Sequence, residues 1–197
     1  MRRAALRRSE LCAIDLLCRQ NFASIYDLSR PAIDKFSLPV EVTFDSFASF
    51  CEKTGYPRAD LGGAGADGVT LRQRGQYIVL WNEAIENDRR RAFTLAHEVG
   101  HILLGHANET PEAEEKEANA FAASLLAPAI AVRYLEKRDG IPMTEERLSA
   151  YFFLSGEAAK NRLRDLRRRV ASLPADVEIT LLLHLFGRLE VNEEVSK

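Results

Sequence analysis

The sequence predicts an α+β fold: a small antiparallel sheet packed on helices, with a helix-turn-helix-like segment near the C-terminus. Two β-like runs, VTLRQ at 69–73 and QYIVLW at 76–81, lie on either side of an Arg-Gly pair and indicate a hairpin. Longer segments repeat apolar residues at spacings of three and four, as helices do. The 197 residues are 46% hydrophobic and 28% charged, which is a globular composition with room for a sizeable core.

The first sixty residues are expected to be mainly helical. Apolar residues near one face predict a helix over 4–20. A second apolar helix face follows Thr43, the candidate N-cap, and Gly55 marks its end. The Gly-rich stretch 61–68 predicts a loop that leads into the hairpin.

Helical periodicity continues after the hairpin. Asn87 or Asp88 is expected to cap a helix whose apolar positions recur at spacings of three and four. Further helices are predicted at 113–127 and 129–137, with a boundary at Gly140. Beyond it we expect a short helix, a Ser-Gly turn and a longer helix, while the β-like run VEITLLLHLF has no assigned place.

Composition and charge narrow the classes of function. The net charge is −2, so nothing global favours a polyanion such as nucleic acid as the main partner. The three cysteines lack CxxC spacing and are expected to be reduced thiols. Charged residues interrupt the apolar stretch behind the N-terminal arginines, which argues against a secretory signal or a membrane helix. We therefore expect a cytoplasmic protein that does not contact a membrane.

Three of the four histidines lie within ten residues, in FTLAHEVGHILLGH. His97 and His101 are one helical turn apart, so both imidazoles can reach one metal ion. Neutral imidazole suits zinc, and Glu98 is placed to take a proton from a zinc-bound water. The alternative is a pair of hydrogen-bonded histidines without metal. Apolar neighbours disfavour it, because four buried ring nitrogens would then need partners.

A catalytic zinc ion needs a third protein ligand and an open position for water. His106 follows His101 by five residues, a spacing that a continuous helix would turn away from the pair. The apolar stripe of the next helix, extended backwards, reaches Glu117 and Glu114 and excludes Glu115. A carboxylate on an apolar face needs a partner, which zinc would supply. We predict Glu117 as the third ligand, with Glu114 as the alternative.

Two histidines, a ligating glutamate and a general-base glutamate are the apparatus of thermolysin-like peptide hydrolysis. Such a reaction also needs a hydrogen-bond donor for the tetrahedral oxyanion. The sequence leaves four candidates for this donor open: His106, Arg133, Tyr134 and Tyr151.

The segments NEAIENDRRRAFTLAHEVGHILLGH and EKEANAFAASLLAP together resemble the ImmA/IrrE family of metallopeptidases, whose pattern is RFTLAHELGH followed by an EANxFA helix. The resemblance covers at least residues 66–128 and, through LSAYFFLSGEAAKNRLRDL, extends to about residue 168. It implies a zincin-like fold and a zinc-dependent endopeptidase that cleaves a helix-turn-helix transcriptional repressor, so that repression is relieved under stress.

The resemblance also implies roles for particular residues. It gives His97 and His101 as Zn²⁺ ligands, Glu98 as the base and the glutamate of EAN, Glu117, as the third ligand. The family often has a histidine at the position of Gly105, whereas this chain has one a single place later.

The chain is expected to divide into four parts. These are an N-terminal helical region (1–60), the zinc metallopeptidase core (61–139), the helix-turn-helix-like segment (140–172) and a tail of unknown role (173–197).

Basic residues crowd the longer helix of the helix-turn-helix-like segment: Lys160, Arg162, Arg164, Arg167 and Arg168. They could make weak contacts with DNA phosphates, although such a run is also typical of a solvated face. Three hypotheses follow: a peptidase acting on a regulator, a DNA-binding regulator with a structural zinc, and an interaction protein with a vestigial metal site. Glu98 favours the peptidase, because a structural zinc is closed by four ligands and needs no base.

Overall fold

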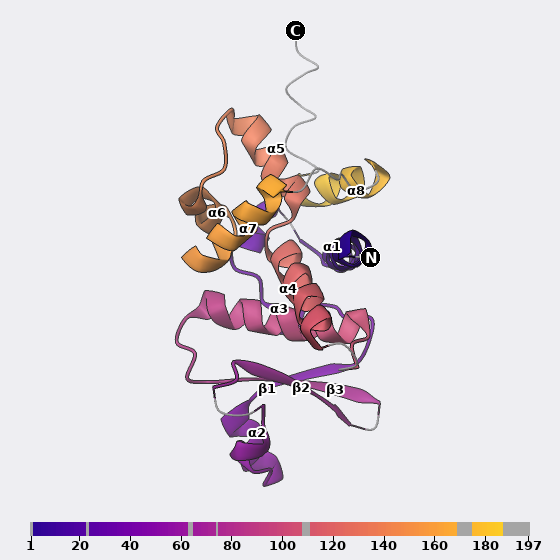
Figure 1. Cartoon of the computed structure of the whole chain (residues 1–197), viewed down its shortest axis with the longest axis vertical. Coiled ribbons are helices and arrows are strands. Elements are labelled where there is room, and N and C mark those ends of the chain that lie inside the picture. The colour runs from indigo at the N-terminus through magenta and orange to yellow at the C-terminus, as the bar shows by residue number, and fades with distance from the viewer. Residues whose placement is uncertain are drawn as a thin grey trace.

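Helices surround one small sheet in the computed structural model (Figure 1), which describes residues 2–22, 24–62, 65–73, 75–107, 111–168 and 175–186. The predicted α+β class is confirmed. The strands are β1 (Val42–Ser46), β2 (Gly68–Gln73) and β3 (Gln76–Trp81). The helices are α1 (Arg2–Cys18), α2 (Phe47–Thr54), α3 (Asp88–Leu104), α4 (Pro111–Leu126), α5 (Ala129–Asp139), α6 (Glu145–Tyr151), α7 (Gly156–Arg168) and α8 (Ala175–Phe186), and 3-10 turns occur at Ile25–Ser29, Ile33–Lys35 and Arg58–Asp60. Parts of the predicted helix-turn-helix-like segment and of the tail lie outside the described residues.

The sheet has three strands in the order β1-β3-β2. The predicted hairpin of β2 and β3 is confirmed, and its antiparallel register pairs Thr70 with Val79. Strand β1 instead runs parallel to β3, with Phe44 opposite Val79. The sheet is therefore mixed, and the expectation of an antiparallel sheet holds only for the hairpin.

The helix expected to begin at Thr43 begins later. Val42–Ser46 form β1, because β3 provides a parallel partner for their backbone groups. Ser46 is the actual N-cap of α2, and its hydroxyl accepts a 3.1 Å hydrogen bond from the Ser49 N–H. Gly55 ends α2 as predicted, with φ of 70°, a left-handed conformation that glycine adopts without strain.

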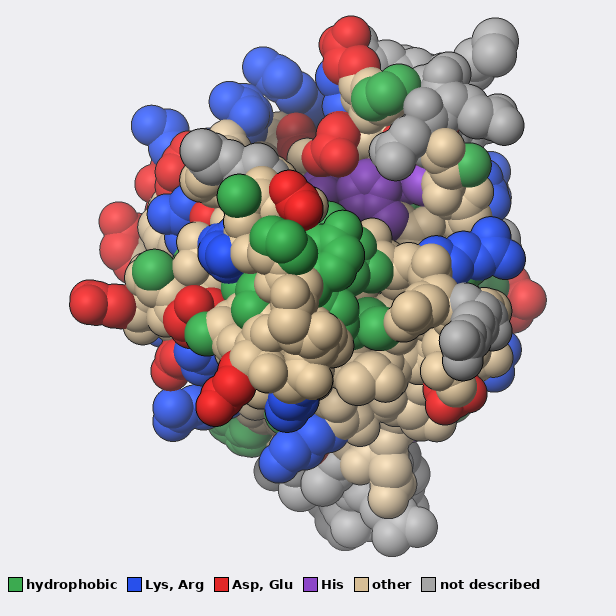
Figure 2. Space-filling view, turned by 90° about the horizontal axis from the view of Figure 1, so that it is seen from below, with side chains coloured by type: hydrophobic (Ala, Val, Ile, Leu, Met, Phe, Trp, Pro, Cys, Tyr) green, Lys and Arg blue, Asp and Glu red, His purple; other side chains and the backbone are tan. Residues whose placement is uncertain are grey.

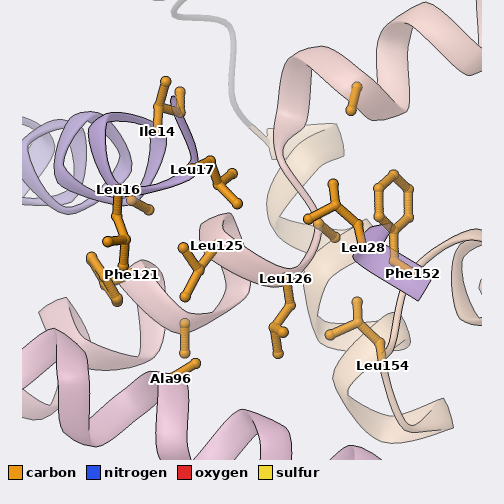
Figure 3. Packing of buried hydrophobic residues seen from close by; sticks show 14 of the residues in the cluster. Ile14, Leu16, Leu17, Leu28, Ala96, Phe121, Leu125, Leu126, Phe152 and Leu154 are labelled. Atoms are coloured by element: carbon orange, nitrogen blue, oxygen red, sulfur yellow. The ribbon is translucent and has the colours of Figure 1, made fainter. Parts of the chain in front are cut away.

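The elements form layers around the motif helix. α2 lies on one side of the sheet and α3 on the other, with α4 beyond α3 (Figure 1). Figure 3 shows side chains of α1, α3 and α4 meeting in one apolar core, including Leu16, Ala96, Phe121 and Leu125, each at most 1% exposed. A buried Leu or Phe side chain contributes roughly 1.5–3 kcal/mol to folding. This core therefore fixes how α4 lies against α3.

Gly100 allows α4 to approach α3 closely. A Cβ at this position would lie 2.9 Å from Cδ1 and 3.3 Å from Cβ of Phe121. Phe121 is fully buried in a close-packed core, so its ring has no space into which to move. The glycine of HEVGH thus sets the separation between the motif helix and the helix that carries the acidic residues.

We expect Gly100→Ala to lower the free energy of unfolding. Overpacking against Phe121 costs about 1–3 kcal/mol, and the better helix propensity of alanine offsets only about 1 kcal/mol of this. Urea unfolding measures the net change. Gly156→Ala is the control, because a Cβ there meets nothing within 4 Å. Equal losses for the two variants would contradict the close-approach explanation.

The segment after α5 contains a helix pair, α6 and α7, that packs together. The hydroxyl of Ser155 accepts a hydrogen bond from the Ala158 N–H at the start of α7. Arg162, on the same helix, is 1% exposed and donates two hydrogen bonds to the Ala127 carbonyl at 2.9 and 2.8 Å. Arg162 therefore points into the protein, which removes it from the residues expected to contact DNA.

The β-like run near the C-terminus is helical in the structure and forms most of α8. Leu181 and Leu185 are one turn apart and at most 2% exposed. Helix α8 packs against α1 and α5, so helical spacing brings these leucines to one buried face.

One stretch, Pro111–Asp139, is long and apolar enough to cross a membrane by length and composition alone. However, 72% of its apolar window is buried inside the protein, as in the core helix of a folded domain. Its helices α4 and α5 pack against α1, α3 and α8, which accounts for their apolar character.

Candidate metal centre

Two caps position the motif helix α3. Of the two predicted caps, Asn87 is the N-cap, and its side-chain oxygen accepts hydrogen bonds from the N–H groups of Arg89 and Arg90 at 3.0 and 3.2 Å. Gly105 has φ of 70° and ends the helix. The HEVGH motif lies between these caps on regular helix, so its first and last residues share one face.

The two motif histidines converge on one point. Their Nε2 atoms are 3.0 Å apart, and their side chains are 16% and 17% exposed. The carboxylate of Glu115, on α4, reaches the same point. Its Oε2 lies 3.2 Å from Nε2 of His97, and its Oε1 lies 3.3 Å from Nε2 of His101. One ligand atom from each of the three residues lies within 4.8 Å of the others.

This donor set fits a divalent metal ion. Two imidazole nitrogens and one carboxylate oxygen are the protein ligands of a common catalytic zinc site. Burial, and then the neighbouring His101, lower the pKa of His97, which favours the neutral form that binds metal. Because both Nε2 atoms and the carboxylate point at one place, a single cation can satisfy all three.

The acidic residue beside both histidines is Glu115, which the argument from the apolar stripe had excluded. Glu117 lies elsewhere, with Oε2 3.5 Å from Nε2 of His106, and Glu114 is buried. The reason is that the centre lies at the solvent-open border of the contact between α3 and α4, where the 57% exposed side chain of Glu115 reaches it. A ligand role for Glu117 stays a prediction, and the geometry favours Glu115.

Glu98 faces strand β2. The Thr70 hydroxyl donates a 2.7 Å hydrogen bond to Oε2 of Glu98. Gly68 permits the close approach, because a Cβ there would lie 2.6 Å from Cγ2 of Thr94 and 3.4 Å from Cγ of Glu98. Burial raises the pKa of Glu98, and the hydrogen bond from Thr70 opposes this only in part. Glu98 is therefore fixed in position and more basic than an exposed glutamate, as a proton acceptor should be.

In the metal-free protein, we expect Glu98→Gln to raise the Tm at neutral pH. The pKa of Glu98 is higher in the folded state than in the unfolded state, so the folded state binds this proton more tightly. Ionisation of Glu98 therefore lowers the free energy of unfolding. The loss begins as the pH rises through the pKa of Glu98 in the unfolded state and is complete above its pKa in the folded state. Glutamine carries no such cost. Thermal unfolding in a chelator from mildly acidic to neutral pH measures the difference, and a gain that is independent of pH would contradict this explanation.

Of the four candidate oxyanion donors, His106 contacts a motif histidine, with its Nδ1 3.0 Å from Nδ1 of His101. The other three candidates lie on α5 and α6. The Tyr151 hydroxyl there donates a 3.0 Å hydrogen bond to Asp139, which ties α6 to the end of α5. This bond gives Tyr151 a structural role.

Histidine side chains reach the surface beside a patch of hydrophobic side chains, with acidic groups nearby (Figure 2). On the α2 side of the sheet, a small core of Phe47, Leu61 and Leu80 is surrounded by partly buried apolar residues. Apolar surface next to polar groups is typical of interaction sites. Figure 2 therefore shows histidine, apolar and acidic side chains together on one face of the protein.

A small sheet on a helix that carries HExxH, with a glutamate from the next helix beside both histidines, defines a candidate metallopeptidase centre. Comparison with protein families agrees with this class: the model of the IrrE N-terminal-like domain, a peptidase family, matches residues 57–164. The chain belongs to this family, as the resemblance of its motifs implied. Comparison with curated proteins gave no match.

Proposed function

We propose that this protein is a zinc-dependent endopeptidase. The observation that carries the proposal is a partly buried carboxylate, Glu98, next to the group of two histidines and Glu115. A structural zinc is closed by four protein ligands, whereas this group offers three and has a base beside it. Membership of a peptidase family supports the peptidase part of this proposal.

In this proposal His97, His101 and Glu115 hold the ion. Zinc bound there would lower the pKa of a water molecule and polarise the substrate carbonyl. Thr70 fixes one oxygen of Glu98, and the other accepts the water proton. Because burial raises the pKa of Glu98, the carboxyl group can retain this proton and then deliver it to the leaving amine.

The substrate is proposed to lie extended along β2. This strand is at an edge of the sheet, so among the described residues its outer backbone groups have no strand partner. An extended peptide can add to such an edge through main-chain hydrogen bonds. Thr70 lies within β2 and contacts Glu98, so a peptide paired with β2 would pass the base.

The proposed substrate is a cytoplasmic helix-turn-helix transcriptional repressor, whose cleavage would relieve repression. The support for this substrate is the resemblance to ImmA/IrrE peptidases over residues 66–168, together with the family match.

A cleavage assay with purified components tests the function. The zinc-loaded protein is incubated with helix-turn-helix repressors from the same genome, and fragments are identified by mass spectrometry. We expect cleavage that EDTA abolishes and added zinc restores. A protein that takes up no zinc in equilibrium dialysis would refute the metal centre. Zinc uptake with an intact repressor, but cleavage of an unfolded protein, would refute only the substrate.

A second candidate function, weak DNA contact, is favoured by one face of α7. Its exposed basic residues are Lys160, Arg164, Arg167 and Arg168. Each phosphate contact adds to the salt dependence of binding. We expect weak binding to a duplex from the protein's own promoter, lost at high salt and reduced in a Lys160→Ala, Arg164→Ala variant. Fluorescence anisotropy measures this binding. DNA binding that changes neither with salt nor with these substitutions would contradict a contact through α7.

A further inference from the structure

A row of three side chains, His101, His106 and Glu117, begins on the side of the His101 ring that faces away from the candidate metal position. Nε2 of His101 faces His97 and Glu115, whereas its Nδ1 lies 3.0 Å from Nδ1 of His106. Nε2 of His106 lies in turn 3.5 Å from Oε2 of Glu117. The side chains of His106 and Glu117 are 6% and 18% exposed. A carboxylate and two imidazoles thus lead continuously to the candidate metal position.

The end of α3 creates this row. Gly105 turns the chain back, so that the His106 N–H donates to the carbonyl of His101 at 3.0 Å. On a continuous helix, His106 would face away from the histidine pair. The turn instead sets its ring edge-on to that of His101, with centroids 4.9 Å apart. The contact was missed from the sequence because the spacing argument assumed that the helix continues.

The metal position at one end of the row and the Glu117 carboxylate at the other determine which ring nitrogen of each histidine carries the proton. When Nε2 of His101 faces a metal ion, the ring proton is on Nδ1 and is donated to Nδ1 of His106. His106 then carries its proton on Nε2 and donates it to the carboxylate of Glu117. In this arrangement each ring nitrogen either donates or accepts, and none is left without a partner. Glu117, which is only 18% exposed, thereby obtains the hydrogen-bond partner that a largely buried carboxylate requires.

We propose that His106 and Glu117 are positioning residues that fix the tautomer and ring orientation of His101 and so strengthen its binding to the metal ion. The inference rests on the proposed metal centre. A ligating histidine usually donates its second ring N–H directly to a carboxylate, a carbonyl or water. Here an interposed imidazole extends that connection to a carboxylate on α4, which gives this helix a second attachment to the motif besides Glu115.

Zinc affinity tests the proposal without any substrate. Competition with a chromophoric chelator measures the affinity, and we expect His106→Ala to weaken binding by roughly 10–100-fold, the range for outer-shell partners. His106→Asn keeps an acceptor near the position of Nδ1 and is expected to restore most of the affinity. Glu117→Gln keeps an acceptor without the charge, so an intermediate loss is expected. Glu112→Gln, which removes an exposed charge from the same helix, is the matched control.

A purely structural role gives a different pattern. If His106 only packs against His101, asparagine does not restore affinity, and the loss follows the fall in metal-free Tm across the variants. Long-range imidazole NMR spectra of the zinc-loaded protein provide a second measurement, with Nδ1–H expected for His101 and Nε2–H for His106. The opposite tautomers, or unchanged affinity in His106→Ala, overturn the positioning role and leave the metal centre standing. A wild-type protein that binds no zinc overturns both.

Discussion

Replacing Glu98 with glutamine is expected to leave zinc bound and to lower kcat by about 10²–10⁴-fold, the usual contribution of a positioned general acid or base. Glutamine has nearly the same shape and still offers Thr70 an acceptor for its 2.7 Å hydrogen bond. The amide cannot accept a proton from water. The loss is therefore expected in the chemical step, with KM for the repressor little changed.

The matched control for Glu98→Gln is Glu86→Gln, which removes an exposed charge just before α3 and is expected to be fully active. Zinc content measured on the same samples separates a lost base from a lost ion. Undiminished cleavage would remove Glu98 from the mechanism. Loss of zinc together with activity would place Glu98 among the ligands instead.

The motif helix could be predicted because its determinants are local. Asn87 acts on backbone groups within one turn, and the spacing of His97 and His101 fixes their common face. The structure confirms Asn87 as the N-cap and brings the two Nε2 atoms to 3.0 Å. The helix and half of the candidate centre therefore follow from short-range rules.

The acidic partner depends on how two helices lie against each other, which short-range rules do not determine. The apolar stripe of α4 was identified correctly, since Phe121 and its neighbours are buried. The centre, however, lies at the border of that stripe. Gly100 lets α4 come close enough for Glu115 to reach the histidines from the solvent side, and the same arrangement leaves Glu117 against His106.

Strand β1 and helix α8 show the same limit in the fold. The segment Val42–Ser46 is a strand only because β3, much later in the chain, pairs with it in parallel. In α8 the β-branched residues favour a strand locally. Burial of Leu181 and Leu185 against α1 and α5 favours a helix, and this tertiary packing decides the outcome.

Glu115→Ala is expected to cause the largest loss of zinc affinity among single substitutions of the acidic residues of α4. It removes the carboxylate that lies 3.2 and 3.3 Å from the two Nε2 atoms, so the loss should exceed the roughly 10–100-fold expected for an outer-shell partner. The side chain of Glu115 is 57% exposed, so the metal-free Tm should hardly change. Chelator competition measures the affinity, and thermal unfolding with and without zinc measures the stabilisation that bound metal provides.

Glu117→Ala distinguishes the two assignments of the third ligand, because Glu115 and Glu117 lie on the same helix and differ in which histidine they contact. If Glu115 is the ligand, Glu117→Ala weakens zinc binding only within the outer-shell range, and zinc still raises the Tm. If Glu117→Ala instead removes zinc binding while Glu115→Ala retains it, then α4 must rotate when the ion binds. The ligand set predicted from the sequence would then be correct, and the row through His106 could not exist in the metal-bound protein.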